Sequence, residues 1–376
     1  MLRFFSLALF IFSINVVSAQ VDSTQQNSKR NPFIVELEVE NGGILASKDV
    51  KNTTFEHAYY NGINLRLGWK IIHSSDKLFK LYNNPIYGFG IYSSTFNTDI
   101  IGSPYALYGF IQSPFGKLTS QKWHFDYRIG LGMSGNFRPY DEDTNPLNLV
   151  IGTKNNVYID LGIRTQYQIS SKFRAGAGLS FHHFSNGAMR LPNKGINLIP
   201  IALSITYKPA GEQRLQKERP LMDSLKGKIY YHVNYGLGFK QINRDVEKRY
   251  MKTTLSAYAS THVSPKWRMG GGLDIFYSAS GNNEEIAGDE HGKLAAKLSG
   301  GPSYYIAHIL NKNLVLNGNI GYYIHNQEFN GEIQKIFLRA GARYYVYKNL
   351  NAGASIKAHM GKADFIEWTM GYTFNR

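Results

Sequence analysis

Apolar and polar residues alternate along most of the chain after residue 32. In the stretch WHFDYRIGLGM, residues 123–133, every odd position is apolar, and every even position is polar, charged or glycine. The stretches VYIDLGIRTQY (157–167) and INLRLGWKI (63–71) repeat this pattern. Because successive side chains of a β-strand point to opposite faces, the alternation predicts strands with one apolar and one polar face.

The two faces of these strands indicate a membrane protein rather than a soluble sandwich. The polar face carries charges and glycines, and the apolar face carries aromatic residues near the strand ends. Long polar links alternate with tight turns along about sixteen such strands, as in outer-membrane barrels with long outer loops. We therefore expect an all-β, antiparallel transmembrane β-barrel with lipid outside and a polar lumen.

The chain divides into two related halves. The segment SKFRAGAGLSFHHFS (171–185) is echoed by PKWRMGGGLDIFYSA (265–279), and a long polar segment, 209–226, separates the halves. We expect an eight-stranded barrel unit at 33–208 and a second barrel unit at 227–376. One sixteen-stranded barrel is the alternative. Opposite charges nearly balance on the polar face of the first half, which suits a small barrel filled by its own side chains.

The amino-terminal segment carries an export signal. Arg3 is followed by an apolar run that ends at the small residues Val17, Ser18 and Ala19. This pattern predicts a signal peptide at 1–19, since the run is too short for a membrane helix, and residues 20–32 then form an extension. Export and barrel architecture together predict an integral protein of a Gram-negative outer membrane.

Composition and charge agree with that location. The chain has 37 glycines, 26 tyrosines and 22 phenylalanines but only 18% charged residues, and it has no cysteine. Disulfide and thiol chemistry are therefore excluded. The net charge of +15 predicts an anionic partner. An anionic lipid surface is the expected one, because the chain carries no nucleic-acid-binding motif.

Candidate chemistry lies in the stretch FHHFSNGAMRLPNKGIN, residues 181–197. The parity of the strand places His183 and Ser185 on the lipid-facing side, at the outer end of the strand. The returning strand places Asn197 on its lipid-facing side as well. An imidazole beside a hydroxyl can accept its proton and make it a nucleophile, and a third group can orient the imidazole.

The segments HFSN and PNKGIN within 183–197 resemble the motif of the PagL-type lipid A 3-O-deacylases, which are also called acyloxyacyl hydrolases. These are eight-stranded outer-membrane barrels that hydrolyse an ester-linked acyl chain of lipid A. The resemblance implies that His183 is the base and Ser185 the nucleophile. It also implies that Asn186 or Asn193 supports the oxyanion, helped by nearby backbone N–H groups, and that lipopolysaccharide is the partner.

One position departs from the family pattern. The family has an acidic residue where this chain has Asn197, which can still orient the imidazole but supplies no charge. The acidic loop residues Glu142 and Asp143 are alternative sources of a carboxylate. Arg190 and Lys194 can bind lipid phosphates, although the general basicity of a barrel rim explains them nearly as well.

Ester hydrolysis by such a triad requires no cofactor and no metal. The adjacent histidines His182 and His183 face opposite sides of a strand and cannot chelate one metal together. Two rival functions stay open at this point. One is a non-catalytic barrel, either structural or a pore, and the other is a phospholipase-like barrel that uses the same residues.

Overall fold

The computed structural model describes residues 30–45, 58–116, 119–120, 122–212, 225, 227–244, 247–359 and 362–376. The expected signal peptide at 1–19 and most of the expected linker at 209–226 lie outside these residues. Within the described part, Asn31–Arg376 is one compact unit.

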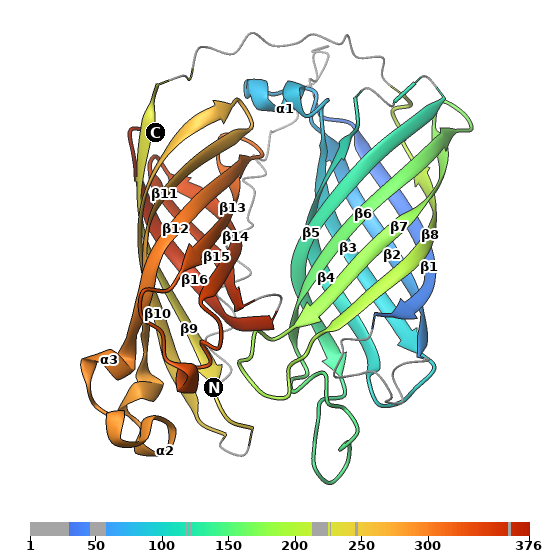
Figure 1. Cartoon of the computed structure of the whole chain (residues 1–376). Coiled ribbons are helices and arrows are strands. Elements are labelled where there is room, and N and C mark those ends of the chain that lie inside the picture. The colour runs from blue at the N-terminus through green and yellow to red at the C-terminus, as the bar shows by residue number, and fades with distance from the viewer. Residues whose placement is uncertain are drawn as a thin grey trace, which may run out of the picture. The chain divides into compact units, whose positions relative to one another are not determined.

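The described chain forms two closed antiparallel barrels of eight strands each, which Figure 1 shows in successive colours. The strands of the first barrel are β1 (Phe33–Ile44), β2 (Tyr59–Lys70), β3 (Ile86–Phe96), β4 (Gly102–Pro114), β5 (Trp123–Phe137), β6 (Asn156–Gln168), β7 (Phe173–Ser185) and β8 (Ile196–Tyr207). Those of the second are β9 (Ile229–Gln241), β10 (Arg249–Ser264), β11 (Trp267–Ser278), β12 (Leu298–Ile309), β13 (Leu314–Tyr322), β14 (Ile336–Tyr347), β15 (Leu350–His359) and β16 (Lys362–Phe374).

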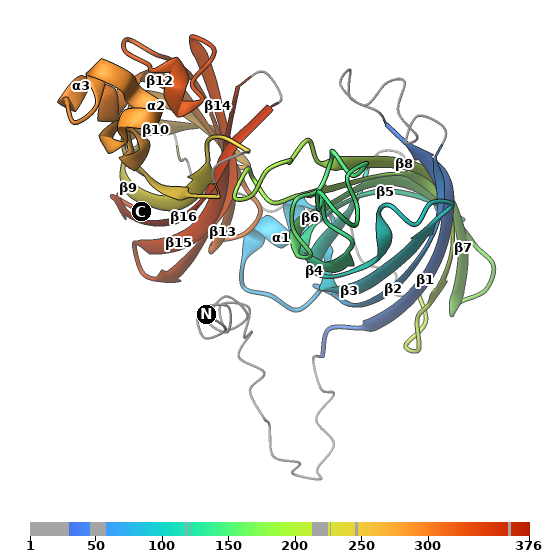
Figure 2. The ribbon, with the colours of Figure 1, turned by 90° about the horizontal axis from the view of Figure 1, so that it is seen from below.

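Each barrel closes on itself by pairing its last strand with its first. In the first barrel, β8 pairs with β1 from Val35↔Tyr207 to Ile44↔Leu198. In the second, β16 pairs with β9 and Glu367 lies opposite Gly238. Figure 2 shows the strands of each half closing into its own ring. The expectation of two eight-stranded barrels is therefore confirmed, and the alternative of one sixteen-stranded barrel is wrong.

Helical segments are short and lie in the links between strands. They are α1 (Lys77–Leu81), η2 (Ala279–Asn282), α2 (Glu284–Ala287), η3 (Gly288–Glu290), α3 (Leu294–Lys297) and η4 (Glu328–Asn330). Asp76 caps α1 by accepting a hydrogen bond from the backbone N–H of Leu78. Among the described residues, no helix is long and apolar enough to cross a membrane.

The outward faces of both barrels are apolar, as the alternation predicts. Ile63 and Leu203 of the first barrel and Trp368 of the second are about half exposed, although they are large and apolar. The residues between them along each strand are buried toward the lumen. Such a wall is stable in lipid, because closure leaves no strand edge with unpaired backbone groups.

The lumen of the first barrel is filled by a network of buried ion pairs. Arg66 donates to Glu36 at 2.8 Å and to Glu38 at 2.7 Å. Arg128 donates to Asp160 at 2.6 Å, and its guanidinium also reaches Glu38. These side chains are nearly inaccessible to solvent. Burial of these charges is tolerated because Glu36, Glu38 and Asp160 each face at least one guanidinium.

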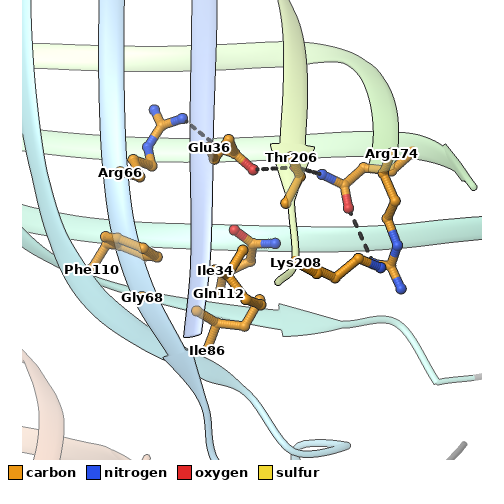
Figure 3. A pocket seen from close by; sticks show the side chains of 11 residues that line it. Ile34, Glu36, Arg66, Gly68, Ile86, Phe110, Gln112, Arg174, Thr206 and Lys208 are labelled. Atoms are coloured by element: carbon orange, nitrogen blue, oxygen red, sulfur yellow. Dashed lines mark hydrogen bonds and ion pairs between the residues drawn. The ribbon is translucent and has the colours of Figure 1, made fainter. Parts of the chain in front are cut away.

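A small cavity interrupts this packing at one end of the lumen (Figure 3). Glu36 accepts a hydrogen bond from Thr206, which accepts one from Gln166, and Gln166 accepts one from Arg174. The cavity beside this chain has room for about one water molecule. The first barrel is therefore a packed body rather than a channel.

The second barrel is packed in the same way with different residues. Arg339 lies between Asp274 and Glu367 at the middle of its lumen. Lys357 contacts Glu332 and Asp364, at 3.1 Å each. Buried charges of both signs thus meet inside this half, although, among the described residues, no ion pair joins the buried Arg268 and Arg343 to a carboxylate. A lumen filled by side chains in this way argues against an open pore.

The buried network predicts a large effect of removing one lumen charge. Arg128→Gln leaves Asp160 and Glu38 short of a partner inside the barrel. Loss of one partner from a buried pair costs about 3–5 kcal/mol, so we expect urea to unfold this variant at a clearly lower concentration. The midpoint is measured by urea titration in detergent micelles.

The control is Lys293→Gln, which removes the exposed ion pair between Lys293 and Glu290. An exposed pair contributes about 1 kcal/mol or less, so its midpoint stays near that of the wild type. Equal midpoints for the two variants would contradict the view that the lumen network stabilises the barrel.

A second cluster of charges closes the end of the first barrel where the cavity lies. Glu212, just beyond β8, pairs with Arg174 and Lys208, and its carboxylate lies 3.6 Å from the amine of Lys70. Burial alone would raise the pKa of Glu212, but the charges of Arg174 and Lys70 outweigh it and lower this pKa to about 2. The folded state therefore favours the ionised carboxylate.

This shift predicts how stability responds to acid. A carboxyl group with a lowered pKa stabilises the fold above its unfolded value of 4.5, and this stabilisation is lost as the pH falls toward about 2. We expect the wild type to exceed Glu212→Gln in free energy of unfolding by up to about 3 kcal/mol at pH 7. Urea titrations of both proteins from pH 7 to pH 2 measure the difference, and a difference that does not shrink in acid would contradict it.

Candidate active site

His183 and Asn197 lie directly opposite each other on neighbouring strands. The register of β7 and β8 pairs these two residues, and their side chains share the outward face. Nδ1 of His183 lies 2.6 Å from the side-chain oxygen Oδ1 of Asn197. A hydrogen bond of this kind fixes the orientation of the imidazole ring and makes Nδ1 the donor.

Ser185 ends strand β7 on the same outward face, but it is covered by the chain that follows it. Its side chain is only 3% exposed. The hydroxyl oxygen Oγ accepts a hydrogen bond from the backbone N–H of Gly187 at 3.1 Å and one from Nδ2 of Asn193 at 2.9 Å. The hydrogen-bond partners of this hydroxyl are thus Gly187 and Asn193 rather than His183.

The two asparagines predicted for the oxyanion site have different surroundings. Asn193 contacts the hydroxyl of Ser185, and its Oδ1 accepts the backbone N–H of Asn186 at 3.1 Å. The side chain of Asn186 instead donates to Thr153 Oγ1 and to the backbone oxygen of Arg190. Asn193 therefore points at the candidate nucleophile, whereas the side chain of Asn186 holds the loop in shape.

The remaining predicted residues lie around this centre. Arg190 forms an exposed ion pair with Glu247 at 3.1 Å. Lys194 donates its backbone N–H to Val150. Glu142 and Asp143 are exposed in the loop between β5 and β6, while Nδ1 of His183 is bonded to Asn197. The hydrogen-bond partner of Nδ1 is therefore Asn197 and not a carboxylate of that loop.

Gly195 has a spatial role that its place in the motif does not reveal. Its φ angle is +73°, a left-handed conformation that glycine adopts readily. A Cβ atom at this position would lie 2.9 Å from Cε1 of His183. Gly195 therefore lets the backbone lie against the imidazole.

Thr153 also belongs to the site, because its Oγ1 accepts a hydrogen bond from the side chain of Asn186. The sequence did not predict this residue, because no motif connects a threonine in one loop to a site in another hairpin.

His182, next to His183 in the sequence, points into the lumen, as the alternation of side chains along the strand predicts. His182 is fully buried, and its ring nitrogens contact Tyr158 at 2.8 Å and Glu40 at 3.0 Å. Over the described part of the chain, no group of three or more histidine, aspartate or glutamate residues could hold a metal ion.

Each barrel matches a protein-family model, and both models describe enzymes that act on acyl chains. The model for lipid A 3-O-deacylase (PagL) matches residues 63–206, and the model for the acyloxyacyl hydrolase C-terminal domain matches residues 229–376. Together these matches span more than three quarters of the chain. No curated protein matches the sequence.

Several solved barrels align with part of the chain. The crystal structure of the outer membrane enzyme PagL aligns at 13% identity and a TM-score of 0.33, over 45% of this chain and 97% of that one. Neisserial surface protein A aligns at 9% identity and 0.31, over 47% and 96%. The N-terminal barrel of Pseudomonas aeruginosa OprF aligns at 13% and 0.27, over 46% and 97%.

The first family match runs from within β2 to β8 of the first barrel and contains the site built around Ser185, and the second match spans all strands of the second barrel. The chain therefore belongs to the PagL family of outer-membrane lipid A deacylases, with an acyloxyacyl hydrolase C-terminal domain as its second barrel.

Proposed function

We propose that this protein is a serine esterase that removes an ester-linked acyl chain from lipid A, with Ser185 as nucleophile and His183 as base. One observation carries the proposal. The hydroxyl of Ser185 is held by two hydrogen-bond donors on the lipid-facing side of the strand that also carries the oriented imidazole of His183. A substrate embedded in the outer leaflet would approach on this lipid-facing side, where His183 lies, and the buried hydroxyl of Ser185 has to become accessible for attack.

The imidazole is prepared to accept a proton on one nitrogen. Because Nδ1 of His183 donates to Asn197, Nε2 carries the lone pair. In the proposed reaction, the hydroxyl of Ser185 turns from Asn193 toward Nε2 and transfers its proton to that nitrogen. It then attacks the ester carbonyl of the acyl chain and forms a tetrahedral intermediate.

Two N–H donors then stabilise the negative charge of that intermediate. The backbone N–H of Gly187 and Nδ2 of Asn193 already point at the hydroxyl oxygen, within 3.1 Å. The carbonyl oxygen binds beside them, where such preorganised donors lower the barrier most effectively. When the bond between the acyl carbon and the sugar oxygen breaks, the imidazolium of His183 gives its proton to that oxygen, which leaves as a hydroxyl; water then attacks the acyl-enzyme with His183 as base and releases the fatty acid.

Asn197 makes the triad weaker than one with a carboxylate. It accepts the Nδ1–H bond, but it supplies no negative charge to stabilise the imidazolium that forms during attack. Hydrogen bonds to an ionised partner are about twice as strong as neutral ones. We therefore propose that the enzyme is active but has a lower kcat than a triad with a carboxylate at this position would give.

Arg190 and Lys194 lie in the same loop as Asn193 and add positive charge at the membrane surface. We include them in the proposal as partners of the lipid A phosphates. Guanidinium and ammonium groups bind phosphate through charge-assisted hydrogen bonds.

Removal of the hydroxyl of Ser185 should abolish deacylation. Lipid A from outer membranes that contain the wild type should lack one hydroxyacyl chain, whereas lipid A from membranes with Ser185→Ala should keep it. Mass spectrometry of extracted lipid A measures the difference. Heat-modifiable migration on gels serves as the control for folding of both barrels, and intact lipid A in both samples would contradict the proposed activity.

The charge and hydrogen-bonding capacity at position 197 should set the rate of the reaction. Asn197→Asp keeps an acceptor for Nδ1 and adds the missing charge, so we expect kcat to rise about tenfold. Asn197→Leu removes the acceptor at similar size, and we expect kcat to fall about tenfold or more. Rates of acyl release from lipopolysaccharide in detergent micelles measure both. Equal rates for all three proteins would exclude Asn197 from the triad.

A further inference from the structure

The loop that follows Ser185 is held by hydrogen bonds from the second barrel. Gln241, the last residue of β9, is buried, with 3% of its surface exposed. Its side-chain Oε1 accepts the backbone N–H of Leu191 at 2.9 Å, and its own backbone N–H donates to the oxygen of Ala188 at 3.0 Å. One residue of the second barrel thus bonds to two backbone groups of the loop.

The backbone of Gly187 packs directly against strand β16. A Cβ atom at Gly187 would lie 2.3 Å from Cγ1 of Ile366 and 3.0 Å from its backbone nitrogen. No side chain fits between them. Gly187 is also the residue whose N–H contacts the hydroxyl of Ser185. Ile366 is therefore separated from the candidate nucleophile by a single backbone unit.

The conformation of this loop needs support. Gly187 and Ala188 have φ angles of +62° and +59°, in the left-handed region. Glycine occupies that region at little cost, but alanine does so only where surrounding contacts hold it. For Ala188, the contact with Gln241 comes from outside the loop and from another barrel.

We propose that the second barrel is a positioning element of the hydrolase site, in which Gln241 and Ile366 hold residues 187–191 so that the donors of the oxyanion site stay aimed at Ser185. The inference rests on the proposed function and deepens it. It gives the C-terminal domain a part in the reaction, although none of its residues touches the reacting atoms.

A second contact between the barrels provides the comparison that isolates this effect. Tyr82, at the end of α1, donates its hydroxyl hydrogen to the backbone oxygen of Ile309 at 2.7 Å, and the same hydroxyl contacts His308 at 3.1 Å. α1 lies in the link between β2 and β3, at the opposite end of the first barrel from the Ser185 loop (Figure 1). This contact joins the two barrels without touching the site.

The experiment compares Gln241→Ala, Gln241→Glu and Tyr82→Phe in the full chain. For Gln241→Ala, we expect kcat for acyl release from lipopolysaccharide to fall about three- to tenfold while KM changes less than twofold, since one hydrogen bond is lost. Gln241→Glu retains the acceptor for Leu191 and should restore most of kcat. Tyr82→Phe should retain the wild-type kcat.

A second measurement does not depend on activity. Hydrogen–deuterium exchange in detergent micelles should show faster exchange of the backbone amides of residues 187–191 in Gln241→Ala than in the wild type or in Tyr82→Phe. Unchanged exchange in this loop would overturn the inference even if the wild type proves inactive on lipopolysaccharide. Equal loss of kcat in Gln241→Ala and Tyr82→Phe would also overturn it, because general loosening between the barrels would then explain both.

The two hypotheses can fail separately. An inactive wild type with loop exchange that depends on Gln241 would contradict the esterase function but support the positioning role. An active wild type with unchanged kcat and unchanged exchange in Gln241→Ala would support the esterase function and overturn the positioning role.

Discussion

Pairing of the backbone in a medium without water is the constraint on which the rest of this structure depends. Each barrel satisfies it by joining its last strand to its first, so that no strand edge faces lipid. Closure in turn assigns every side chain to the lumen or to the lipid. The lumen of an eight-stranded barrel is narrow, and here it is filled by paired charges such as Arg66 with Glu36. The outer rim is left as the place where chemistry on a lipid can occur.

The sequence predicts those parts of the site that follow from strand periodicity. The alternation places His183 and Asn197 on the outward face, and their side chains meet across neighbouring strands. Periodicity ends at Ser185, where the chain leaves the sheet. The hydrogen bonds from Gly187 and Asn193 depend on left-handed turns in a loop, and no repeating pattern reports such turns. The contact of Gln241 with this loop joins residues about fifty positions apart, without a motif in either.

The two halves share an architecture but use it differently. Where the first has His183 and Ser185, the corresponding positions of the second, by the echo between 171–185 and 265–279, are Tyr277 and Ala279. The second barrel therefore lacks its own copy of this pair. It retains the packed lumen and the apolar wall, which suit a partner that supports a site rather than one that contains it.

The presence of both barrels on one chain has a consequence for the behaviour of the protein in a membrane. Contacts between separate subunits are lost when the proteins are sparse, because association depends on surface concentration. Here the second barrel is covalently attached, so its local concentration beside the Ser185 loop is set by the chain that connects the barrels and not by expression. Dilution in the bilayer, which separates the subunits of an oligomeric enzyme, should therefore leave this site assembled.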